Sequence, residues 1–316
     1  MSSLLSDALD GALRDVPARR HIQSFVVAHQ GEVRLERYFR DRRGTDLSNL
    51  HSVTKSVVAT LAALALRNGS LEVETLLGDL LDERLFPEDG RKRQISIEHL
   101  LTMTTGLDAG TPHDIDEIAD RGDPWIAGPL AAPLRAEPGA TFGYNNGAAH
   151  VLGAAIARAT DMPLARFAEE QLFKPLGIRD FRWPTDPEGN ALGYGHLELR
   201  PRDLVRLGLL YLAGGRWDGE QLLPESFVAA AAKCRRPTRG HVVRLPLVDH
   251  GGRWVSLVLR RRLRRPVPDR DPRARTRRRE YRRRRRLHRD VPQPAPARER
   301  DRRSPGRRLT AGRRVG

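Results

Sequence analysis

The stretch from His51 to Gly69, HSVTKSVVATLAALALRNG, constrains the fold of this chain more than any other. Beyond Lys55 its apolar residues fall on most faces of a helix, and Gly69 stands where a left-handed helix cap is common. A helix that is apolar on most faces belongs in a protein core. We therefore expect a buried helix around which the rest of the domain packs.

Ser52 and Lys55 lie three residues apart at the start of this helix, so their side chains share one face. A lysine becomes a usable base near neutral pH only if burial and the positive end of a helix lower its pKa. The first turn of an apolar helix meets both conditions. The pattern therefore indicates a serine nucleophile beside a lysine base, although a capping serine followed by a surface lysine would give the same letters.

Two motifs together resemble those of a known family. The letters S-V-T-K-S before an apolar helix resemble the first active-site motif of the serine β-lactamase and penicillin-binding-protein superfamily. The letters Tyr144-Asn145-Asn146 resemble the Y-x-N motif of class C β-lactamases and related esterases, although a half-buried tyrosine before a helix cap would read the same. In that family the phenol relays the serine proton and the asparagine amide orients the lysine and the substrate. The resemblance thus implies the catalytic residues Ser52, Lys55, Tyr144 and Asn146, and we expect Asn146 also to cap the next helix.

The order of the predicted elements matches the same superfamily. These elements are an amphipathic helix over 3–16, a hairpin of strands 24–29 and 32–39, the helix at 51–69, a short helix within 97–107 capped at Gly106, and a buried helix over 202–212. The resemblance extends over residues 22–232. It implies an α/β (α+β) fold of the β-lactamase/transpeptidase type, in which an antiparallel sheet is flanked by helices and carries a helical subdomain.

Arginine is unevenly distributed along the 316 residues. Residues 235–316 hold 30 arginines, no lysine and 7 acidic residues, whereas residues 1–234 carry a net charge of −7. Apolar periodicity also ends after Ala232. We therefore predict a hydrolase domain over 1–234 and an Arg- and Pro-rich, disordered basic tail over 235–316, and we expect the C-terminal strands of the sheet to be missing.

The basic tail has three possible origins: a nucleic-acid-binding arm, a solvated polybasic extension, or translation of a GC-rich gene in a wrong frame. Arginine without lysine, together with many prolines, favours the third, and no nucleic-acid-binding motif accompanies the charge. The family's third motif, Lys-Thr-Gly or His-x-Gly, would fall in this region. Its nearest match is His250, Gly251 and Gly252.

The composition and the terminal sequence limit which partners and which cellular location we expect. A single cysteine, Cys234, excludes an internal disulfide, and no cluster of Cys and His has metal-ligand spacing, so we expect neither metal nor cofactor. The N-terminus has no signal-peptide pattern and no apolar run reaches 18 residues, which predicts a cytoplasmic protein without a membrane partner. We expect a small-molecule ester, amide or lactam substrate and no nucleic-acid partner; the motifs do not indicate an oligomeric state. The alternative is a catalytically inactive scaffold, truncated or frame-shifted.

Overall fold

The computed structural model describes residues 11, 13, 22–86, 90–232 and 255–256. All of them fall in the first of two compact units, which spans residues 1–261. The helix predicted over 3–16 lies outside the described residues, apart from residues 11 and 13, and so does almost all of the basic tail. The predicted boundary between residues 234 and 235 stays a prediction.

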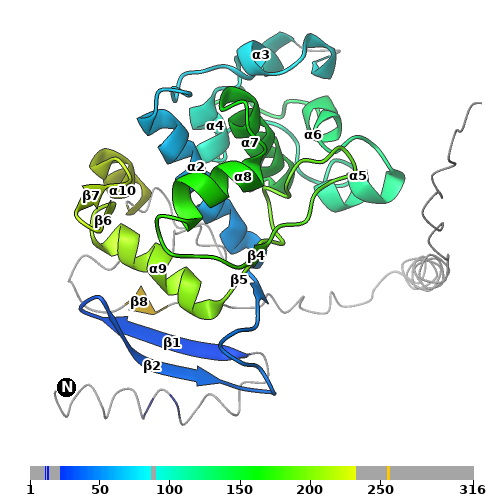
Figure 1. Ribbon diagram of the computed structural model, residues 1–316. Coiled ribbons are helices and arrows are strands. Elements are labelled where there is room, and N and C mark those ends of the chain that lie inside the picture. Colours follow the sequence, from blue (N-terminus) through cyan, green and yellow to red (C-terminus); the bar gives the residue numbers. More distant parts are fainter. Residues whose placement is uncertain (1–10, 12, 14–21, 87–89, 233–254, 257–316) are drawn as a thin grey trace, which may run out of the picture. The chain divides into compact units, whose positions relative to one another are not determined.

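The central helix α2 (Thr54–Arg67) confirms the buried helix that the sequence predicts. A 3-10 turn, η1 (His51–Val53), leads directly into it. Ten of its residues are buried, among them Val57, Leu61 and Leu64. Gly69 follows the end of the helix with a φ of +77°, the left-handed conformation that glycine adopts at little cost. This helix packs against α7 (Asn146–Ala159), and Figure 1 shows α9 (Pro201–Leu212) on the other side of it.

The predicted hairpin is present as β1 (Ser24–His29) and β2 (Glu32–Tyr38), which pair antiparallel. A third strand, β8 (Val255–Ser256), pairs antiparallel with the other edge of β1, so one short strand does come from the C-terminal stretch. The helix α9 (Pro201–Leu212) packs against β1 and separates this sheet from α2 (Figure 1). The observed layers are thus sheet, α9 and helical body, as expected for the β-lactamase/transpeptidase-like fold.

Most of the remaining helices and strands in the described part of the chain are short, and three 3-10 or π turns lie among them: η2 (Glu83–Leu85), η3 (Gly90–Gln94) and η4 (Glu169–Phe173). The helices are α3 (Leu77–Leu80), α4 (Ile97–Leu101), α5 (Ile115–Arg121), α6 (Ala127–Ala131), α7 (Asn146–Ala159), α8 (Leu164–Ala168) and α10 (Glu225–Ala232). The strands are β3 (Ser48–Asn49), β4 (Phe181–Arg182), β5 (Glu198–Leu199), β6 (Arg216–Trp217) and β7 (Glu220–Gln221). Strands β3, β5 and β4 form a second antiparallel sheet, in that order. This sheet joins the segment before α2 to the segment before α9.

Two predicted helix caps are wrong. The N-cap of α7 is Asn145 rather than Asn146, and its side-chain oxygen accepts the N–H of Ala148 at 2.9 Å. The helix α4 ends at Leu101, well before Gly106. Gly106 does have a positive φ, but a Cβ there would collide with the carbonyl oxygen of Ala136, so this glycine serves a close backbone approach instead.

None of the helices in the described part of the chain has the length and apolar character needed to cross a membrane.

Candidate active site

The start of α2 brings Ser52 and Lys55 together. The Lys55 amine donates to Ser52 Oγ at 3.3 Å. Ser52 is exposed, whereas Lys55 is only 9% exposed. Because the hydroxyl faces solvent and the amine lies beneath it, a substrate could reach the serine while the lysine remains shielded from water.

Two hydrogen bonds to the backbone of Leu197 fix the start of α2. Leu50 donates its N–H to the carbonyl oxygen of Leu197 at 2.8 Å, and the N–H of Leu197 donates to Thr54 Oγ1 at 3.3 Å. Between these contacts His51 has a φ of +47°, a conformation that costs a non-glycine residue free energy. The N–H of His51 donates to Asn49 Oδ1 at 2.7 Å, which stabilises this turn directly before Ser52.

Tyr144 comes from a distant part of the chain and completes the arrangement. Its phenol oxygen lies 2.9 Å from Ser52 Oγ, although the two residues are 92 positions apart. The loop that carries it is held by the segment after α4, because Gly143 donates its N–H to the carbonyl of Met103 at 2.8 Å. Lys55 Nζ also lies 5.0 Å from the centroid of the Tyr144 ring. The serine hydroxyl is therefore within reach of both an amine and a phenol.

Burial lowers the pKa of Lys55 to about 7, and the negative charge of Asp114 opposes this shift. A lysine with such a pKa is neutral in a substantial fraction of molecules near pH 7, and a neutral amine can accept a proton. The amine also donates to the backbone carbonyl of Tyr194 at 2.6 Å. This contact holds one N–H bond in a fixed direction, which constrains where the nitrogen lone pair points.

Asn146 lies in the first turn of α7, two residues beyond Tyr144, and is partly buried. Within the described residues, no side-chain hydrogen bond joins it to Lys55; the lysine is bonded to Ser52 and Tyr194 instead. Sequence reasoning missed the Tyr194 carbonyl. A backbone oxygen carries no residue-type signal, so no sequence motif could have pointed to it.

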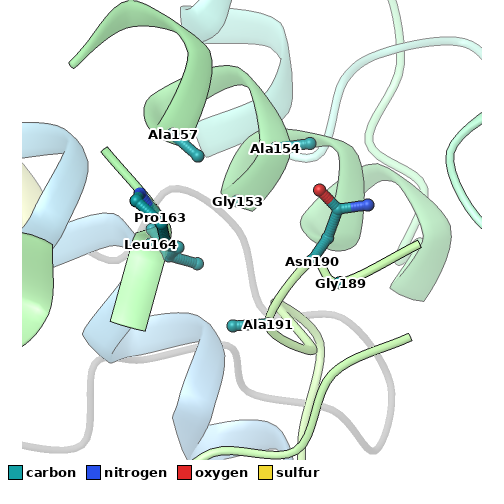
Figure 2. Close-up of a pocket in the computed structure, with 8 residues that line it drawn as sticks. All are labelled: Gly153, Ala154, Ala157, Pro163, Leu164, Gly189, Asn190 and Ala191. Carbon is teal, nitrogen blue, oxygen red and sulfur yellow. The ribbon is translucent and has the colours of Figure 1, made fainter. Parts of the chain in front are cut away.

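The candidate third motif, His250 to Gly252, lies outside the described residues. In the described ranges, no group of His, Cys, Asp and Glu side chains could hold a metal ion. Figure 2 shows a small pocket between α7 and the loop at residues 189–191. Its volume is about 30 Å³, and Ser52, Lys55 and Tyr144 are not among its lining residues, so it is distinct from the candidate site.

The model of the Beta-lactamase family matches residues 9–282, most of the chain. The chain belongs to the Beta-lactamase family. Esterase EstB of Burkholderia gladioli is 32% identical over 236 residues, a match that covers 66% of this chain and 59% of EstB. The chain thus spans less than two thirds of the length of that relative.

Solved structures agree with the Beta-lactamase family at the level of the fold. A class C β-lactamase from Rhodobacter sphaeroides aligns with a TM-score of 0.53 and 21% identity, covering 71% of this chain and 70% of that one. A D-amino acid amidase from Ochrobactrum anthropi aligns with a TM-score of 0.56 and 22% identity, covering 75% and 76%. Because these identities are low, they show a shared β-lactamase/transpeptidase-like fold and leave the substrate open.

Proposed function

We propose that this chain is a serine hydrolase that acts through an acyl-enzyme on Ser52, with a small-molecule ester, amide or β-lactam as substrate. The observation that carries the proposal is the contact of Ser52 Oγ with two other polar groups, the Tyr144 phenol at 2.9 Å and the Lys55 amine at 3.3 Å. A hydroxyl needs an adjacent base to attack a carbonyl near neutral pH. The lowered pKa of Lys55 supplies one.

The proposed reaction has two halves. Ser52 Oγ bonds to the carbonyl carbon while its proton passes to the neutral Lys55 amine, directly or through the Tyr144 phenol. When the bond to the leaving group breaks, the same pair returns the proton to that group. Water then attacks the acyl-enzyme and releases the acid, and Ser52 recovers its proton. In this scheme Asn146 orients the lysine and the substrate.

The negative charge on the carbonyl oxygen needs hydrogen-bond donors. We propose the backbone N–H of Ser52 as one of them. The second would come from the strand that carries the third motif, for which His250 to Gly252 is the candidate.

Esters are the first substrates to test, because EstB, the relative with 32% identity, is named an esterase. The proposed mechanism uses neither a cofactor nor a nucleic-acid partner. That both are absent stays a prediction. The cytoplasmic location stays a prediction, which fractionation of cells expressing the chain would test.

The test compares two serines of the same helical segment. The wild-type chain should be labelled by a fluorophosphonate at Ser52 and should hydrolyse p-nitrophenyl esters. Ser52→Ala should lose the label and reduce hydrolysis by about 10³-fold or more, since the proposed site has no other nucleophile. Ser56→Ala, one turn further along, should retain both. Hydrolysis that survives Ser52→Ala would refute the proposal, and a wild type without label or hydrolysis would favour the inactive scaffold.

A further inference from the structure

A buried pair of polar side chains lies behind the proposed site. His150, in the second turn of α7, places its Nε2 atom 2.9 Å from Asp186 Oδ2, and both side chains are fully buried. The Trp125 and Tyr194 rings pack against the imidazole edge to face, at 6.0 and 5.9 Å between ring centroids. The proposed reaction does not use either residue, yet burying such groups costs free energy unless they are fully hydrogen-bonded.

The hydrogen-bond partners of His150 indicate which imidazole nitrogen carries the proton. The N–H of Gly193 donates to His150 Nδ1 at 3.3 Å, so Nδ1 is the acceptor and the proton sits on Nε2, which donates to Asp186. The carboxylate is held by further donors. Asp186 Oδ1 accepts the backbone N–H groups of Glu188 at 2.9 Å and Asn190 at 2.8 Å, and Oδ2 accepts the Asn190 side-chain amide at 2.9 Å. The carboxylate therefore has one fixed orientation and requires a donor from His150.

The residue that His150 binds directly precedes the residue that accepts the Lys55 amine. Gly193, which donates to His150, precedes Tyr194, whose carbonyl accepts the Lys55 amine at 2.6 Å. Gly193 also lies directly on α7, because a Cβ there would collide with the carbonyl oxygen of Ala149. The position of the Tyr194 carbonyl is thus set by the contact of this loop with α7.

The α7 helix also positions Tyr144, whose phenol is one of the two groups that contact Ser52. Tyr144 precedes α7 by two residues, so the helix that holds the Gly193 segment also holds the phenol. Figure 2 shows the neighbouring part of this contact, where Gly189 to Ala191 face the α7 residues Gly153, Ala154 and Ala157. The hollow between them, at about 30 Å³, is far below the ~300 Å³ typical of ligand pockets, so the buried pair does not serve a bound ligand there.

We propose that His150 and Asp186 are positioning residues for Lys55: by fixing the backbone N–H of Gly193 against α7, they hold the next residue, Tyr194, whose carbonyl orients the lysine amine toward Ser52. This inference rests on the proposed function. Displacing a catalytic group by about 1 Å can cost about 100-fold in rate, so loss of the pair should reduce turnover although neither residue touches the substrate.

Three variants test this role. Both His150→Leu and His150→Asn remove the donor to Asp186, but only His150→Asn keeps an acceptor oxygen for Gly193, close to the position of Nδ1. Asp186→Asn changes almost no volume but places an amide donor opposite His150, which forces the imidazole proton onto Nδ1, where it faces the Gly193 N–H. Each is assayed as kcat and KM on a p-nitrophenyl ester per Ser52 that a fluorophosphonate can label. Counting labelled sites corrects for any misfolded fraction, which a purely structural role would produce.

We expect kcat to fall about 10- to 100-fold in His150→Leu and Asp186→Asn with little change in KM, and His150→Asn to fall clearly less than His150→Leu, because Gly193 keeps its acceptor. A normal kcat per labelled site in His150→Leu or in Asp186→Asn would overturn the inference. If the wild type neither labels nor hydrolyses, the proposed function fails. The inference is then judged by crystal structures, in which Asp186→Asn must lose the contact between Lys55 Nζ and the Tyr194 carbonyl and His150→Asn must keep it.

Discussion

At the scale of single residues, the site depends on how differently Ser52 and Lys55 are exposed. They are three positions apart, yet the serine is open to solvent and the lysine is 9% exposed. A charged ammonium in this position would lose most of its hydration, and the Tyr194 carbonyl and the Ser52 hydroxyl, to which the amine donates, replace only part of it. The free-energy cost of burying the charge is what lowers the pKa and makes the amine a base.

The pH dependence of acylation follows from this shift. Because burial lowers the pKa of Lys55 to about 7, the amine is protonated below that pH and cannot accept the Ser52 proton. The rate of fluorophosphonate labelling should therefore be low near pH 5, rise through about 7 and level off above pH 8. The second-order rate constant measured from pH 5 to 9 checks this. A rate that is flat over the range, or that rises only near pH 10, would mean that Lys55 is not the base.

At the scale of secondary-structure elements, the sequence predicts those helices and strands that are determined by the pattern of neighbouring residues. The α2 helix was predictable from a long apolar stretch that ends at Gly69, and the β1–β2 hairpin from two β-rich runs on either side of Gln30 and Gly31. The cap of α7 was not, since Asn145 and Asn146 are adjacent and chemically equivalent as caps. Only the backbone path before the helix decides between them: Asn145 has the extended conformation, with φ −135° and ψ 112°.

Contacts between distant elements were beyond sequence reasoning. The hydrogen bond from Lys55 to the Tyr194 carbonyl joins residues 139 positions apart, and the pair of His150 and Asp186 spans 36 positions. Neither has a periodic or motif signal in a single sequence. The Tyr144 contact was predictable only through the resemblance to a family, which supplied the spatial relation that spacing alone cannot give.

Alanine variants of the two asparagines at the start of α7 should separate effects on stability from effects on activity. Asn145→Ala removes the acceptor of the Ala148 N–H and should lower the free energy of unfolding by about 1 kcal/mol. Asn146→Ala removes no cap, so we expect little change in stability but slower ester hydrolysis, because of its proposed role toward the lysine and substrate. Urea unfolding and kcat/KM measured on both variants decide this. The assignment of Asn146 is contradicted if its alanine variant hydrolyses esters at the wild-type rate.

At the scale of the whole molecule, three different positions are candidates for the C-terminal end of the hydrolase domain. Charge and apolar periodicity change after residue 234, compact packing divides the chain at residue 261, and the family match extends to residue 282. The strand β8 lies between the first two boundaries and pairs with Val27 and Ala28 of β1, both buried. A domain that ended at residue 234 would leave that edge of β1 without this partner.

Truncation distinguishes these boundaries. A chain ending at residue 261 keeps β8 and the candidate third motif, so we expect its rate of Ser52 labelling to match that of the full chain. A chain ending at residue 234 loses both. It should label about 100-fold more slowly, as loss of one oxyanion donor would cause, and should self-associate through the bare edge of β1. Labelling kinetics and light scattering on the two truncated chains and the full chain provide the measurement. Equal labelling of the 1–234 chain would place the whole catalytic unit before the arginine-rich stretch, whereas an inactive 1–261 chain would mean that residues 262–316 contribute to the enzyme.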